Sequence, residues 1–70
     1  MFLYKIEIEL QDQLLYLIVA AESEEKAFSY VDSHMDRHFL KSPDKQEVSI
    51  VEKKRLDQGA GYVIETHALG

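Results

Sequence analysis

With 70 residues and no cysteine, the chain has room for a single hydrophobic core and excludes disulfides and thiolate metal sites as a source of stability. The hydrophobic fraction of 46% and the charged fraction of 30% are typical of a globular protein and exclude wholesale disorder. The net charge of −5 comes from residues 1–40, which hold eight acidic and three basic side chains, and this balance disfavours binding to nucleic acid or anionic membranes.

The chain begins with a pattern typical of a β-hairpin. Apolar residues occupy every even position from Phe2 to Leu10, and charged residues lie between most of them, as in a half-buried strand. A short polar break follows, and the apolar run Leu14–Ala21 predicts the second strand. This run is too short for a membrane-spanning helix, which needs about 20 residues. Because the alternation starts close to Met1, without a secretory leader, we expect a cytoplasmic protein.

The pairing register of this hairpin has two alternatives, because the polar break contains no glycine that would fix the turn type. If Leu10 pairs with Leu14, Tyr16 faces the core. If Leu10 pairs with Leu15, Tyr16 faces away and the aliphatic residues at odd positions face inward. The second register is preferred, because it places Tyr16 opposite Glu9 on the open face of the sheet.

Residues from Ser23 onward predict one helix. The Ser23 hydroxyl is suited to cap the first turn, and Glu24 and Glu25 lie favourably at the positive end of the helix dipole. The helix ends before Pro43, because the residue that precedes a proline disfavours the helical conformation. An apolar stripe at helical spacing is expected to pack on the sheet and consists of Ala27, Phe28, Val31, Met35 and Phe39.

Two further strands are predicted after the helix, within residues 47–54 and 62–64, because both segments contain clusters of β-branched or aromatic residues. The segment between them is typical of a loop in which Gly59 or Gly61 supplies a positive φ angle.

The predicted fold class is therefore α+β with the order β-β-α-β-β: a four-stranded, mostly antiparallel sheet with one helix packed on one face. Residues 1–66 are expected to form a single domain and residues 67–70 a flexible C-terminal tail. The strand order stays open, because the helix can connect two parallel neighbouring strands or the second hairpin can dock elsewhere.

Four segments of the chain carry a resemblance to a known family: Ala20–Phe28, Phe39–Lys41, Val51–Lys54 and Gly59–Ile64. They make the chain similar to a group of proteins of about this length from spore-forming Gram-positive bacteria, and the similarity extends over nearly the whole chain up to Glu65. That family has no assigned activity. The resemblance implies a bacterial cytoplasmic setting and supplies no functional residues.

His34 and His38 are the candidate metal ligands. Their spacing of four residues on one helical face lets both imidazoles reach one metal ion, with His67 or a nearby carboxylate as a third ligand. Met35 replaces the glutamate that follows the first histidine in metalloprotease helices, so no general base for hydrolysis is positioned. Metal binding is therefore an alternative hypothesis, and no cofactor is expected.

The basic run Lys53, Lys54 and Arg55, together with Tyr62, forms a candidate nucleic-acid contact, in which phosphate binding would lie beside a base-stacking ring. In a strand, Lys53 and Arg55 point to one side and Lys54 to the other, so the run does not concentrate on one face. Weak nucleic-acid binding is therefore a second alternative, disfavoured by the acidic composition.

The apolar run Leu14–Ala21 points most directly to function, because one helix covers only one face of the sheet. Tyr16 and Ile18 are then left exposed, with Glu7 and Glu9 beside them, or Leu15 and Leu17 in the other register. We expect a non-enzymatic protein-interaction or regulatory module that acts through the open sheet face or a strand edge. Its partner is another protein or a second copy in a homodimer. No enzyme activity is expected, because no serine lies in a nucleophile elbow and this fold leaves little pocket volume.

Overall fold

The structure is a computed structural model, and it describes residues 1–65. Its centre is an antiparallel sheet in which β1 (Phe2–Glu9) lies between β2 (Leu14–Ala21) and β3 (Glu47–Arg55). Because β2 and β3 are both antiparallel to β1, they run in the same direction, and they do not pair with each other. The connection between them crosses one face of the sheet, so β1 is inserted between two parallel strands.

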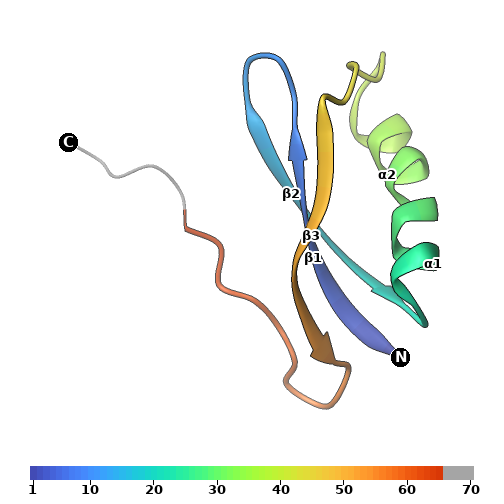
Figure 1. The fold of residues 1–70 in the computed structure, drawn as a ribbon, viewed down its shortest axis with the longest axis vertical. Helices are drawn as coiled ribbons and strands as arrows, with labels where there is room; N and C mark the ends of the chain where they lie inside the picture. The colour runs from blue at the N-terminus through green and yellow to red at the C-terminus, as the bar shows by residue number, and fades with distance from the viewer. Residues whose placement is uncertain (66–70) are drawn as a thin grey trace.

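The helical layer consists of α1 (Glu24–Ser29) and α2 (Val31–His38), which meet at Tyr30. Both helices lie on one face of the sheet, and the last described segment runs along the other side (Figure 1). The predicted cap is confirmed, because the Ser23 Oγ accepts a hydrogen bond from the Lys26 backbone N–H at 3.2 Å. Within the described part of the chain, no helix is long and apolar enough to cross a membrane.

The prediction of a four-stranded β-β-α-β-β sheet is wrong. Within residues 1–65 the sheet has three strands, and residues 62–64 form none of them. After β3 the chain turns at Gly59, which has the expected positive φ of 82°, and leaves the plane of the sheet. β3 bears charged side chains, and its ladder with β1 contains a register irregularity; both features oppose the addition of a further strand beside it. The predicted tail, residues 67–70, lies outside the described residues.

The hairpin residues point to the faces expected from the preferred register, but the pairing of the two strands is displaced by two residues from that register. Ile8 pairs with Leu15, and the Leu10 N–H donates to the Gln13 carbonyl oxygen at 2.9 Å. Leu10 therefore lies opposite Gln13 and pairs with neither predicted partner. The turn is shorter than expected because Gln13, which looks like part of the polar break, continues the ladder. Odd residues of β2 still face the helices, as the preferred register requires.

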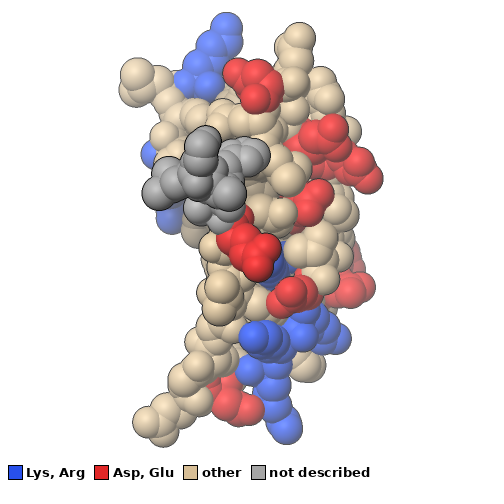
Figure 2. Space-filling view, turned by 90° about the vertical axis from the view of Figure 1, so that its left-hand side faces the viewer, with Lys and Arg blue, Asp and Glu red and all other residues tan. Residues whose placement is uncertain are grey.

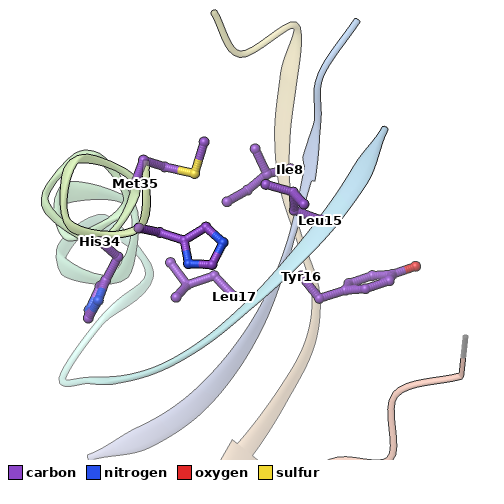
Figure 3. A pocket seen from close by; sticks show the side chains of 7 residues that line it. Ile8, Leu15, Tyr16, Leu17, His34 and Met35 are labelled. Atoms are coloured by element: carbon purple, nitrogen blue, oxygen red, sulfur yellow. The ribbon is translucent and has the colours of Figure 1, made fainter. Parts of the chain in front are cut away.

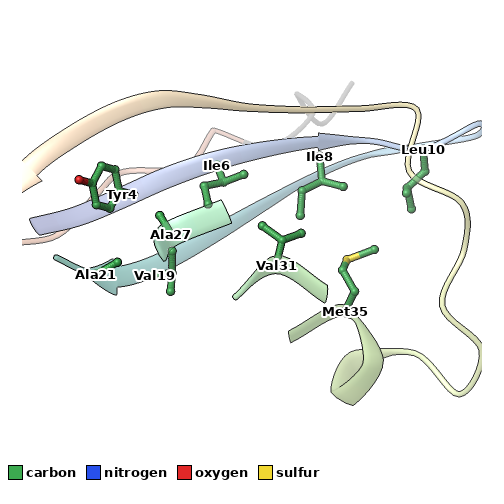
Figure 4. Packing of buried hydrophobic residues seen from close by; sticks show 9 residues of the cluster. All are labelled: Tyr4, Ile6, Ile8, Leu10, Val19, Ala21, Ala27, Val31 and Met35. Atoms are coloured by element: carbon green, nitrogen blue, oxygen red, sulfur yellow. The ribbon is translucent and has the colours of Figure 1, made fainter. Parts of the chain in front are cut away.

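The core lies between the sheet and the helical layer (Figure 4). Even residues of β1 supply its centre, and the three largest side chains that are fully buried are Tyr4, Ile6 and Ile8. The helical stripe is narrower than predicted, because Phe28 lies about 100° around the helix from Ala27 and is 42% exposed. The buried residues are Tyr4, Ile6, Ile8, Leu10, Val19, Ala21, Ala27, Val31 and Met35.

Replacement of Ser23 by alanine is expected to lower the free energy of unfolding by about 1 kcal/mol, because the first turn of α1 loses its side-chain cap. Urea denaturation followed by circular dichroism measures this change. Ser29→Ala is the matched control, because the Ser29 hydroxyl only donates to the Lys26 carbonyl within the exposed helix, so its loss should change stability by less than half as much. Equal losses for both variants would contradict a specific capping role.

Candidate interaction surface

The open face of the sheet, which lies opposite the helices, brings together the residues predicted for partner binding. In the β1–β2 ladder, Glu7 faces Tyr16, Glu9 faces Leu14, and Ile18 is half-buried opposite a lysine. Tyr16 is 37% exposed and Leu14 is 48% exposed. Glu7, Glu9, Tyr16 and Ile18 therefore share one face, and this face is centred on the hairpin of β1 and β2.

Two charged side chains from β1 hold the Tyr16 ring in place. The Tyr16 hydroxyl donates to the Glu7 Oε2 at 3.4 Å, and the Lys5 Nζ lies 5.0 Å from the ring centroid. The pKa of Tyr16 is raised above its usual value, first by desolvation and then by the negative charge and hydrogen bond of Glu7. These contacts favour the neutral phenol, whose ring lies on the open face.

The last described segment is fastened to the same face through Tyr62. Its hydroxyl donates to the Leu3 carbonyl oxygen at 2.6 Å. The Lys54 Nζ donates to the Gly61 carbonyl at 2.8 Å and lies 4.6 Å from the Tyr62 ring centroid. Desolvation and the charge of Glu52 raise the pKa of Tyr62. The segment thus covers the end of the open face near Leu3, while Val63 remains 85% exposed.

Charged side chains of both signs are distributed over this side of the molecule (Figure 2). They surround a shallow pocket of about 320 Å³ that is lined by Lys5, Tyr16, Glu52, Val63 and Glu65. A surface with mixed charge offers little net attraction to a partner of a single sign. The described part of the open face is therefore better suited to a polar rim than to the centre of an interface.

The residues of the nucleic-acid alternative are divided between the two faces and engaged within the chain. The Lys53 Nζ lies 4.3 Å from the ring centroid of Phe2, and Arg55 is the ladder partner of Phe2. Lys54 instead lies against Tyr62 on the open side. The lysine over the Tyr62 ring occupies a surface on which a base would have to stack.

The two outer edges of the sheet differ in their protection against strand addition. We call the side of β2 (Leu14–Ala21) that faces away from β1 the β2 edge; within the described residues β2 pairs with β1 alone. This strand has no charged residue, proline or bulge. β3 has charges along Glu52–Arg55 and a register shift opposite Lys5 and Ile6. Native sheets protect free edges with such charges and bulges, so the β2 edge is the unprotected one.

A pocket of about 240 Å³ lies beside the β2 edge, between β2 and α2 (Figure 3). Leu15 and Leu17 line it from the sheet and Met35 from the helix, whereas the Tyr16 ring points to the opposite side. Leu15 and Leu17 are only half-buried, although they face the helical layer. The helices therefore leave the outer part of β2 incompletely covered on the core side as well as on the open side.

His34 and His38 form the polar side of this pocket. Their spacing places them on the flank of α2 that faces β2, next to the buried residue Met35. Residues 1–65 contain no group of three or more metal-ligating side chains, and the proposed third ligand His67 lies outside them. What the described structure offers at this place is an apolar pocket with two imidazoles.

Comparison with protein families places the chain in a group that has no known activity. The profile of the family described as "Protein of unknown function (DUF3906)" matches residues 1–64, which include all three strands, both helices and Tyr62. The chain belongs to this family. The expected resemblance to a family without assigned activity is confirmed, whereas the spore-former distribution stays a prediction. No curated protein and no solved structure shows significant similarity to the chain.

The family match supplies no functional residues, so the candidate interaction surface is defined from the structure of the chain alone. Sequence reasoning found the open-face residues because alternation reports which way a side chain points. It missed the pocket between α2 and β2, although the shared helical flank of Tyr30, His34 and His38 was visible as a ridge at a spacing of four. The sequence does not show which strand this flank of the helix faces, because the answer depends on the order of the strands in the sheet.

Proposed function

We propose that the protein is a non-enzymatic protein-interaction module, with a regulatory role in the bacterial cytoplasm, and that it associates through the β2 edge. The observation that carries this proposal is the free, uncharged edge of Leu14–Ala21 with an apolar pocket beside it. Extended segments add to such edges through main-chain hydrogen bonds, and pockets along the edge receive alternate side chains.

The energetics of a small domain favour the same proposal. A 70-residue chain has little stability to spare, yet Leu14 and Tyr16 remain substantially exposed and Leu15 and Leu17 are half-buried. Burial of apolar area contributes roughly 25 cal/mol per Å², so covering this strand would stabilise the fold and the complex together. A partner on the β2 edge would therefore bury apolar side chains of β2 that the helical layer leaves exposed.

Four of the five serine hydroxyls take part in local hydrogen bonds, which supports a non-enzymatic role. Ser29 and Ser33 donate to backbone carbonyls within the helices, and Ser42 donates to the Asp36 carboxylate at 2.5 Å. Ser23 serves as the helix cap. Each of these hydroxyls has a structural partner, and none of these partners is an imidazole base of the kind that activates a nucleophile.

The test compares one charge substitution on each edge of the sheet. Tyr16→Lys places a charge on β2 opposite Glu7, a pairing that the isolated chain tolerates, and Val51→Lys is the matched control on β3, where the side chain is 44% exposed. We expect the wild-type protein to associate in sedimentation and pull-down measurements. Association should weaken at least tenfold in Tyr16→Lys and stay unchanged in Val51→Lys.

Two results would contradict the proposal. One is a wild-type protein that stays monomeric at millimolar concentration and captures no protein that Tyr16→Lys fails to capture. The other is an association that both lysine variants weaken equally, because the β2 edge would then have no special part in it.

A further inference from the structure

We infer that the occupant of the β2 edge is a second copy of this chain, paired antiparallel through β2 about a two-fold axis at Ile18. This inference rests on the proposed function and specifies its partner and its geometry. The product is one continuous six-stranded sheet, in which the two β2 strands are the central pair and both helical layers lie on the same face.

Symmetry restricts the possible registers. Residues directly opposite each other in an antiparallel pair point to the same face, and in β2 the odd residues face the helices. Odd residues must therefore pair with odd residues of the second copy, and even with even. The two registers with the longest overlap place the axis either at Leu17 or at Ile18.

Charge selects between these two registers. With the axis at Leu17, Asp12 in the hairpin turn comes near Glu22 of the second copy, just beyond the ends of the paired strands, and the two-fold axis repeats this like-charge approach at the other end. With the axis at Ile18, Glu22 instead lies opposite Leu14 of the second copy. Like charges directly opposite each other destabilise a strand pair, so the register at Ile18 is favoured.

Side-chain size supports the same register. With the axis at Ile18, the bulky Tyr16 lies opposite Ala20 of the second copy on the open face. On the helix face the half-buried Leu15 lies opposite Ala21. Large side chains thus meet small ones along the strand, which lets the two surfaces interdigitate. The sequence Leu14–Ala21 is complementary to itself because its bulk decreases from one end to the other.

The second copy also explains why a protein with a net charge of −5 has an uncharged contact strand. Repulsion between two acidic molecules is weak at physiological ionic strength when the charges lie more than a Debye length of about 8 Å apart. Between the paired strands there is no charge to desolvate. The pocket that Leu15 and Leu17 help to line lies beside this edge, where the second copy would cover it.

Cysteine cross-linking tests the register, and the absence of native cysteine makes each reading unambiguous. Opposite residues in an antiparallel pair lie about 4.5–5.5 Å apart, within the range that a disulfide bridges. Under mild oxidation we expect Ile18→Cys to form a covalent dimer. Tyr16→Cys and Ala20→Cys should cross-link at least tenfold faster when mixed than when oxidised separately. Val51→Cys, on the other edge strand, should stay monomeric.

Other outcomes overturn the inference in distinguishable ways. A cross-link between Tyr16→Cys and Ile18→Cys, without the Tyr16→Cys and Ala20→Cys product, places the axis at Leu17 and refutes the proposed register. A non-covalent dimer in which no β2 cysteine reacts refutes the β2 interface and the proposed function together. A monomer that captures another protein through the β2 edge refutes the second copy and leaves the proposed function standing.

Hydrogen exchange of the wild-type protein provides a measurement that requires no variant. Amides of β2 that point away from β1 should become at least tenfold more protected as the protein concentration rises from micromolar to millimolar, because they pair with the second copy. The outward amides of β3 should not change with concentration. Exchange at the β2 edge that is independent of concentration would overturn the inference.

Discussion

Replacement of Ile6 by alanine is expected to remove about half of the stability of the fold. Ile6 is fully buried on the central strand, between Leu17 of β2 and Ile50 of β3, and its side chain faces the helical layer. Truncation of a buried aliphatic side chain to alanine costs about 2–5 kcal/mol, through lost burial and the cavity that remains. A chain of this length is stabilised by roughly 4–10 kcal/mol in total. Urea denaturation at 25 °C measures the loss.

A graded series separates packing from a general sensitivity to substitution. Ile6→Val removes a single methylene and should cost about 1 kcal/mol, well below the alanine variant. Leu40→Ala, at a fully exposed position in the connection after α2, should change stability by less than about 0.5 kcal/mol. If Leu40→Ala were as destabilising as Ile6→Ala, the core assigned between sheet and helices would be misplaced.

The elements that the sequence predicted correctly are those determined by neighbours along the chain. Alternation in β1 reports its buried face directly, and Ser23 lies at the start of α1, where its hydroxyl has a local partner. The facing of β2 follows from the same period-two pattern. The exact pairing of β2 does not follow from this pattern. It depends on the geometry of the turn closed by the hydrogen bond between Leu10 and Gln13, and the polar break contains no glycine that would indicate the turn type.

The features that sequence reasoning missed depend on contacts between distant segments. The pairing of β3 with β1 is such a contact. The strand propensity of residues 47–55 would be the same if β3 paired with β2 instead, so the sequence of this segment does not determine its neighbour. Residues 62–64 have strand-forming side chains but find no suitable edge, and Tyr62 instead bonds to the Leu3 carbonyl 59 positions away. Strand propensity shows only that a segment can adopt an extended conformation. To become a strand of a sheet, the segment must also find a free strand edge with which to pair. The missed pocket at the β2 edge follows from the same strand order.

Loss of the Tyr4 hydroxyl is expected to stabilise the protein, whereas loss of the Tyr62 hydroxyl should destabilise it. Tyr4 is fully buried, and its hydroxyl has no hydrogen-bond partner within residues 1–65. A buried polar group without a partner costs about 1–3 kcal/mol, so Tyr4→Phe should raise the free energy of unfolding by at least about 1 kcal/mol while the ring keeps its packing. Urea denaturation and thermal melting measure the change.

The Tyr62→Phe variant is the matched control, because it removes the same hydroxyl from a tyrosine whose oxygen lies 2.6 Å from the Leu3 carbonyl. Its loss should lower the free energy of unfolding by about 1 kcal/mol, the usual net contribution of one hydrogen bond. Opposite signs for one chemical change would show that the environment of each hydroxyl decides its contribution. If Tyr4→Phe were instead destabilising by the same amount, the buried hydroxyl would have to be satisfied in solution. The core face near Tyr4 would then be less closed than its complete burial implies.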